Sequence, residues 1–165
     1  MMKFILIVLT ITFTFSTPFI VNASSVENRI KQFAASEYPN DREMQTYVYN
    51  EQVRAYNYLI NVTDQGVKAF SRREYPNDFA MQKHIYDEQL AAKHYMKSVS
   101  DYEVKRLAQS EYLHDFSMQK YYYDEQLAAK NYMLNVTNKV IKRKAINEYP
   151  NDYAMQKYSY DNAVY

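Results

Sequence analysis

The sequence predicts an all-α protein built from four tandem copies of a two-helix unit, each with a short helix, a Tyr-Pro-Asn-Asp link and a long helix. The first observation is a motif, typified by residues Glu74 to Met96, whose copies begin every 37 residues, at Glu37, Glu74, Glu111 and Glu148. A fixed period of this length is typical of repeat architectures. The second is composition: one glycine and four prolines leave few turns that need positive φ. The third is helical spacing of apolar residues within each copy.

The units span about 26–62, 63–99, 100–136 and 137–165. A helical hairpin of this size cannot bury its apolar face alone, so neighbouring units are expected to stack. Two arrangements are left open, a solenoid-like array and a compact helical bundle.

Composition also excludes several classes of protein. The net charge of +1 gives no basic stripe of the kind that binds nucleic acid, so no nucleic-acid partner is predicted. Cysteine is absent, which excludes disulfides, thiol catalysis and thiolate metal sites. The histidines His84, His94 and His114 occupy different places in their units, so we predict no repeated metal site. No cofactor is predicted, because a single glycine cannot form a Gly-rich phosphate loop.

Residues 1–23 have the pattern of a secretory signal peptide. Lys3 precedes an apolar run, and Val21 and Ala23 hold the positions three and one before the predicted cleavage point. The mature domain is therefore predicted as 24–165, secreted or periplasmic. No second apolar stretch follows, so no membrane span is predicted after cleavage.

The short helix of each unit is predicted from an apolar stripe. In the second unit Val67, Phe70, Ser71 and Tyr75 recur at spacings of three and four, which places them on one helical face. Ser100 and Glu103 match a capping box, which predicts Ser100 as the N-cap of the third short helix. Thr63 and Thr137 hold the equivalent position in the second and fourth units.

The link predicts where one helix ends and the next begins. Proline disfavours helix in the residue before it, so the short helix should end near Glu74 or Tyr75 and their counterparts. The third unit has Leu113-His114 in place of Pro-Asn but keeps Asp115. Aspartate is therefore the predicted N-cap of the long helix.

The long helix is predicted from about Asp78 to Ser98. Two seams at heptad-like spacing lie side by side on it. They consist of Met81, Ile85, Glu88, Ala92, Tyr95 and Val99, and of Gln82, Tyr86, Gln89, Lys93 and Met96. The opposite face, with Lys83, Asp87 and Lys97, is predicted to be solvated.

The repeated polar and aromatic residues of this wide face are the candidate binding residues: Gln45, Tyr49, Glu51, Gln52, Gln82, Tyr86, Glu88, Gln89, Gln119, Tyr123, Glu125 and Gln126. The Glu-Gln pair within this set favours a contact between units over a ligand site, because the fourth copy has Asn162 and Ala163 there. The nineteen tyrosines either fill the stack or form a platform for sugar rings or an extended peptide.

These observations predict an exported, non-enzymatic binding protein whose partner is a protein or a cell-envelope polymer, with head-to-tail self-association as a further expectation. Two alternatives stay open. One is an enzyme that acts on envelope glycans through a glutamate of the tyrosine-lined face, and the other is a structural, tyrosine-rich envelope or matrix component. Asn61 and Asn135 begin N-glycosylation acceptor sequences, which apply only if the source is eukaryotic.

Overall fold

The computed structural model describes residues 23–164, and in this part of the chain all regular structure is α-helical. The predicted signal peptide lies outside the described residues except for Ala23, so it stays a prediction. The short helices are α1 (Ala23–Glu37), α3 (Gln65–Glu74), α5 (Tyr102–Glu111) and α7 (Lys139–Glu148). The long helices are α2 (Arg42–Ile60), α4 (Phe79–Ser98), α6 (Phe116–Asn135) and α8 (Tyr153–Val164).

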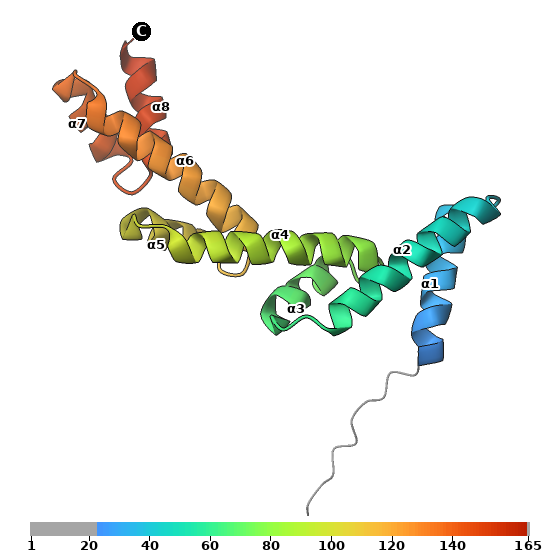
Figure 1. Ribbon diagram of the computed structural model, residues 1–165. Helices are drawn as coiled ribbons and strands as arrows, with labels where there is room; N and C mark the ends of the chain where they lie inside the picture. Colours follow the sequence, from blue (N-terminus) through green and yellow to red (C-terminus); the bar gives the residue numbers. More distant parts are fainter. Residues whose placement is uncertain (1–22, 165) are drawn as a thin grey trace, which may run out of the picture.

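The helices form an open array of stacked hairpins. Each short helix packs on the long helix that follows it, and α2, α4, α6 and α8 pack on one another in succession. Figure 1 shows α1 and α2 at one end of the molecule and α7 and α8 at the other, with the units following one another along an extended path. We call the contact between two successive long helices a joint, so that the chain has an α2–α4, an α4–α6 and an α6–α8 joint.

Aspartates begin the long helices, which confirms the prediction from the third link. Asp41, Asp78 and Asp115 are N-caps whose carboxylates accept a hydrogen bond from the amide three residues later, each at 3.0 Å. Such a cap satisfies an amide that has no partner inside the helix.

The predicted caps of the short helices were wrong by one residue. Asp64, Asp101 and Asn138 are the N-caps, not Thr63, Ser100 and Thr137. Asp64 and Asp101 each also pair with a lysine of their own long helix, Lys93 and Lys130. Glu103, the predicted partner in a capping box, contacts Lys130 instead, at 2.8 Å.

The buried core is divided along the array. Three clusters of buried apolar residues follow one another, around Val67 and Tyr86, around Val104 and Tyr123, and around Ala145 and Tyr160. This serial core is what a stack of like units produces, because each unit buries surface only against its neighbours. No helix within residues 23–164 combines the length and the apolar character needed to cross a bilayer.

Candidate functional site

The glutamines of the Glu-Gln pair join each unit to the next. Gln89 is 4% exposed; its amide nitrogen donates to Asp115 Oδ1 at 2.7 Å, and its amide oxygen accepts from the backbone amide of Phe116 at 2.7 Å. One side chain thus holds the cap residue and the first amide of the next long helix. The same two bonds are made by Gln52, to Asp78 and Phe79, and by Gln126, to Asp152 and Tyr153.

A second set of repeated glutamines holds the bend inside each unit. Gln82 donates to the carbonyl of Tyr75, the residue that ends its short helix, at 2.6 Å. Equivalent bonds of 2.5 to 2.7 Å are made by Gln45, Gln119 and Gln156. These side chains satisfy a helix-end carbonyl and fix the angle between the two helices of the unit.

The repeated tyrosines also lie at the joints. Tyr86, Tyr123 and Tyr160 are nearly fully buried. Each meets a tyrosine of the preceding long helix edge to face, with ring centroids 6.2 to 6.4 Å apart. The Tyr123 hydroxyl accepts a hydrogen bond from the amide of Asp101 at 3.3 Å. Tyr49, in the first unit, is half-buried.

A contact of three side chains, a tyrosine, a lysine and an aspartate, joins the two long helices at each joint. At the α4–α6 joint Tyr95 donates to Asp124, while Lys120 pairs with Asp124 at 2.8 Å and lies over the Tyr95 ring at 4.7 Å. The hydrogen bond to the carboxylate raises the pKa of Tyr95 to about 12. The same contact is formed at the other joints by Tyr58, Lys83 and Asp87, and by Tyr132, Lys157 and Asp161.

Lys97 is exposed as predicted, and the side chains of Lys83 and Asp87 are 41% exposed, but the sequence did not predict that these two also contact a neighbouring helix. Lys83 and Asp87 are only partly exposed and join α4 to Tyr58 of α2. The preceding long helix, α2, packs on this side of α4. The spacing of residues along α4 alone cannot predict where α2 packs.

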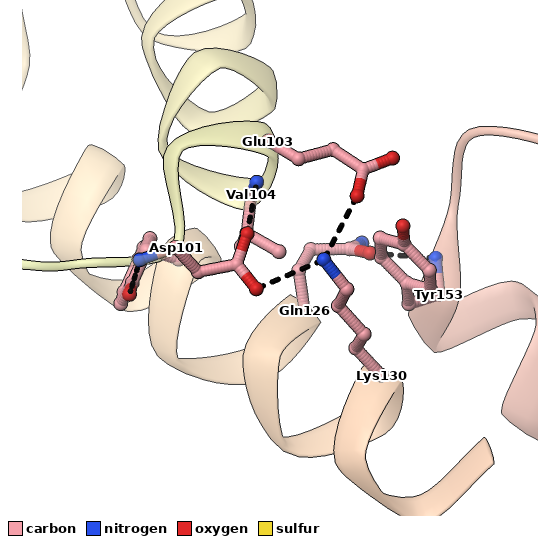
Figure 2. A network of polar contacts seen from close by, with 7 residues as sticks. Asp101, Glu103, Val104, Gln126, Lys130 and Tyr153 are labelled. Atoms are coloured by element: carbon pink, nitrogen blue, oxygen red, sulfur yellow. Dashed lines mark hydrogen bonds and ion pairs between the residues drawn. The ribbon is translucent and has the colours of Figure 1, made fainter. Parts of the chain in front are cut away.

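A lysine near the end of the long helix ties the short helix to the same joint. Lys130 contacts Asp101 at 2.9 Å and Glu103 at 2.8 Å, and its ammonium lies 5.2 Å from the centre of the Tyr153 ring (Figure 2). Hydrogen bonds to Glu103 and Asp101 raise the pKa of Lys130, and the bond from Lys130 lowers the pKa of Asp101. Lys93 repeats the arrangement with Asp64 at 2.6 Å.

Most of the candidate binding residues are thus engaged within the molecule, and two of the glutamates, Glu88 and Glu125, are the exception. Glu51 pairs with Arg54 on its own helix. The carboxylates of Glu88 and Glu125 make no hydrogen bond or ion pair with any residue in 23–164. As binding residues the twelve positions stay a prediction, and of these the two unpaired glutamates have the freedom to contact a partner.

Glu88 and Glu125 lie at a groove of about 580 Å³ on the outer side of the α4–α6 joint. Its lining is Glu88, Ala91 and Ala92 from α4, with Ser117, Lys120, Tyr121, Asp124 and Glu125 from α6. We call this the α4–α6 groove. Three carboxylates and one ammonium line it, so its local charge is negative.

Tyr121 and Ser117 are groove residues that the sequence analysis missed. The Tyr121 side chain is 62% exposed. Its repeat position holds Tyr47, His84 and Tyr158 in the other units, so an aromatic residue at a solvated position in every copy was the available signal. The hydroxyl of Ser117 is covered but has no hydrogen-bond partner among the described residues, which is unusual for a buried polar group.

The other two joints do not reproduce this combination. At the α2–α4 joint the first carboxylate, Glu51, is neutralised by Arg54, and the aromatic position holds His84. At the α6–α8 joint Asn162 replaces the second carboxylate. Two unpaired carboxylates beside an exposed tyrosine therefore meet at the α4–α6 joint.

The remaining predictions concern metals and glycans. Among the described residues no three His, Cys, Asp or Glu side chains are grouped so that they could hold a metal ion. Asn61 and Asn135 are exposed at the ends of α2 and α6, where each donates to the carbonyl four residues earlier, at 2.7 and 2.8 Å. Their glycosylation stays a prediction.

Comparison with known proteins adds no relative. No protein-family model, no curated protein and no solved structure matches the chain.

Proposed function

We propose that this chain is an exported interaction protein that binds, without turnover, a lysine- or arginine-containing segment of a partner polypeptide in the α4–α6 groove. The observation that carries the proposal is the pair of unpaired carboxylates, Glu88 and Glu125, beside the exposed ring of Tyr121. Nearly every other repeated polar side chain at the joints already has a partner inside the molecule.

The chemistry of the groove fits a cationic side chain. Carboxylates accept charge-assisted hydrogen bonds from ammonium or guanidinium groups, which are about twice as strong as neutral ones. An aromatic face adds about 0.5–1 kcal/mol for a cation at an exposed site. The chain itself uses this combination, because Lys120 contacts both the Asp124 carboxylate and the Tyr95 ring.

The size of the groove also fits. Its volume of about 580 Å³ lies within the range of ligand pockets, roughly 300–1,000 Å³. Ala91 and Ala92 have small side chains, which leaves room on the α4 side for one long side chain and its flanking backbone. An uncharged glycan would leave the two carboxylates without a counter-charge, so a basic polypeptide is the better match.

Binding is favoured over catalysis because the two glutamates are copies of one another. Glycoside hydrolysis uses two carboxyl groups in unlike environments, one protonated and one ionised. Glu88 and Glu125 hold the same repeat position on successive long helices, and both are exposed.

The test is a titration of the protein with a tetralysine peptide, followed by calorimetry and by tyrosine fluorescence, which is free of tryptophan signal in this chain. We expect saturable binding that weakens with salt, and no binding of tetraglutamate. The variant Glu88→Gln/Glu125→Gln should lose it, whereas Glu43→Gln/Glu51→Gln, with the same change in charge on α2, should retain it. Equal binding by both double variants, or by both peptides, would refute the proposed site.

Export has its own test. The mass of the protein recovered outside the cytoplasm should correspond to a chain that begins near Ser24. Recovery only inside the cell, with residues 1–23 retained, would contradict the exported part of the proposal.

A further inference from the structure

A second pocket lies on the short-helix side of the α2–α4 joint. It holds about 240 Å³ between α1, α2, α3 and the start of α4. Its apolar wall includes Tyr56, Leu59 and Phe79, and its polar lining includes Arg29, Lys68 and Arg72. Tyr56 and Phe79 meet edge to face in this wall, with ring centroids 5.2 Å apart.

Within residues 23–164 the cations of this pocket have no anionic partner. Arg29 donates to the Pro76 carbonyl at 3.0 Å and to Asn77 Oδ1 at 3.4 Å, both neutral oxygens, and its guanidinium lies 5.6 Å from the Phe79 ring centre. Lys68 and Arg72 form no ion pair with any described residue. No carboxylate among residues 23–164 lines the pocket.

At the α4–α6 and α6–α8 joints the cation at the equivalent position is paired with a carboxylate. There a lysine of the long helix, Lys93 or Lys130, lies 5.2 Å from the ring that begins the next long helix. Each of these lysines is paired with the N-cap aspartate of its short helix, Asp64 or Asp101. At the α2–α4 joint Tyr56 stands in place of that lysine, and the cations come instead from α1 and α3.

Independently of the α4–α6 groove, we propose that this pocket binds a small anionic amphiphile, a carboxylate or phosphate head on an apolar body. Arg29, Lys68 and Arg72 hold the head, and the apolar body lies against Leu59 and Phe79. At roughly 30 Å³ for each non-hydrogen atom, the pocket accommodates about eight such atoms, the size of hexanoate, so the larger phosphate head of hexyl phosphate is expected to extend partly into solvent.

The probes are hexanoate, hexyl phosphate, hexanol, hexylamine and inorganic phosphate, each titrated into the protein by calorimetry. We expect hexanoate or hexyl phosphate to bind with a dissociation constant of about 1 mM or tighter. Comparison of their two dissociation constants shows whether the carboxylate or the phosphate head is preferred. Hexanol and inorganic phosphate should each bind at least about tenfold more weakly, because each lacks one half of the ligand. Hexylamine should not bind.

The charge variant is Lys68→Gln/Arg72→Gln, which leaves the structural bonds of Arg29 in place. It should weaken hexanoate about tenfold or more without changing the melting temperature. The matched control, Lys105→Gln/Arg106→Gln, removes the same charge from α5, where Lys105 holds the repeat position of Lys68, and should bind as the parent does. Ile60→Glu places a carboxylate at the exposed rim and should also weaken binding.

Equal binding of hexanoate and hexylamine would overturn the anion part of the inference, as would an unchanged constant in Lys68→Gln/Arg72→Gln. Inorganic phosphate binding as tightly as hexyl phosphate would overturn the apolar part. Failure of all five probes to bind would overturn the whole inference.

Discussion

Gln89 bonds the two units at the central joint of the array, and replacing it by alanine tests its contribution to stability directly. It lies at the central α4–α6 joint, buried, with both ends of its amide bonded to the next unit. The equivalent residue of the fourth unit is Ala163, so an alanine at this repeat position is compatible with a long helix. The variant Gln89→Ala should therefore keep its helices and lose the bonds across the joint.

The expected loss follows from the two bonds. A hydrogen bond to a carboxylate, here Asp115, contributes about 1.5–3 kcal/mol, and one to a backbone amide, here that of Phe116, about 1 kcal/mol. Asp115 still accepts from the amide of Met118 at 3.0 Å, so the cap itself remains. We expect a loss of about 3 kcal/mol in the free energy of unfolding, which is a large fraction of the stability of a small protein.

Urea unfolding followed by circular dichroism at 222 nm measures this loss. The control is Glu88→Gln, one residue away and exposed, which should stay within about 0.5 kcal/mol of the parent. Gln89→Glu has the same shape but places a second carboxylate against Asp115, so it should lose more than the alanine variant at pH 7 and recover part of the difference in acid.

The position of the joint adds a second expectation. Because neighbouring units stabilise each other, weakening the central joint should separate the array into two halves and broaden the unfolding transition. Gln52→Ala and Gln126→Ala should loosen one terminal unit each. The reasoning is refuted if Gln89→Ala and Glu88→Gln unfold alike.

Three further predictions concern titration and assembly. Asp124→Asn should lower the pKa of Tyr95 from about 12 toward its ordinary value of 10.0, which ultraviolet titration measures. Because the folded pKa is raised, the contact stabilises the fold fully below pH 10, and this stabilisation is lost as the pH rises toward 12. An unchanged titration of Tyr95 would contradict this. Lys130→Met should remove the hydrogen bond that lowers the pKa of Asp101. Because the folded pKa is lowered, the contact stabilises the fold above the unfolded pKa of 3.8, and this stabilisation is lost as the pH falls through the folded pKa. The variant should therefore be less stable than the parent at pH 7 and approach it in acid, and a difference in unfolding free energy that stays constant with pH would disprove this. Head-to-tail self-association stays a prediction from the repeat: light scattering should find oligomers that grow with concentration, and a monomer at every concentration would overturn it.

The local parts of the fold were predictable because their causes are local. A cap aspartate bonds an amide three residues away, and a proline acts on the residue before it, so both can be recognised in a short stretch of sequence. The capping prediction failed at Ser100 because Asp101 is an equally good cap and has a distant partner in Lys130. That partner is 29 residues further along the chain.

The candidate site was less predictable because its residues come from helices that cross. Glu88 and Gln89 recur together, which suggests one shared role, but adjacent residues of a helix point about 100° apart. Gln89 therefore faces the next unit while Glu88 faces solvent. The groove, with Tyr121 and Ser117, exists only where α6 crosses α4, and the pattern along either helix alone does not contain that crossing.

Both proposed sites consist of residues that differ between the duplicated copies of one unit. At every joint the glutamine, the aspartate cap and the buried tyrosine are the same, because removing any of them would cost the stack its buried hydrogen bonds or packing. Residues outside that set can differ between copies at little cost in stability. Those differences produce the surplus of cations around Arg29 at one joint and the surplus of carboxylates beside Tyr121 at the next. Specific binding should therefore change most when a joint's distinctive residues are exchanged for those of another copy, while the free energy of unfolding should change little.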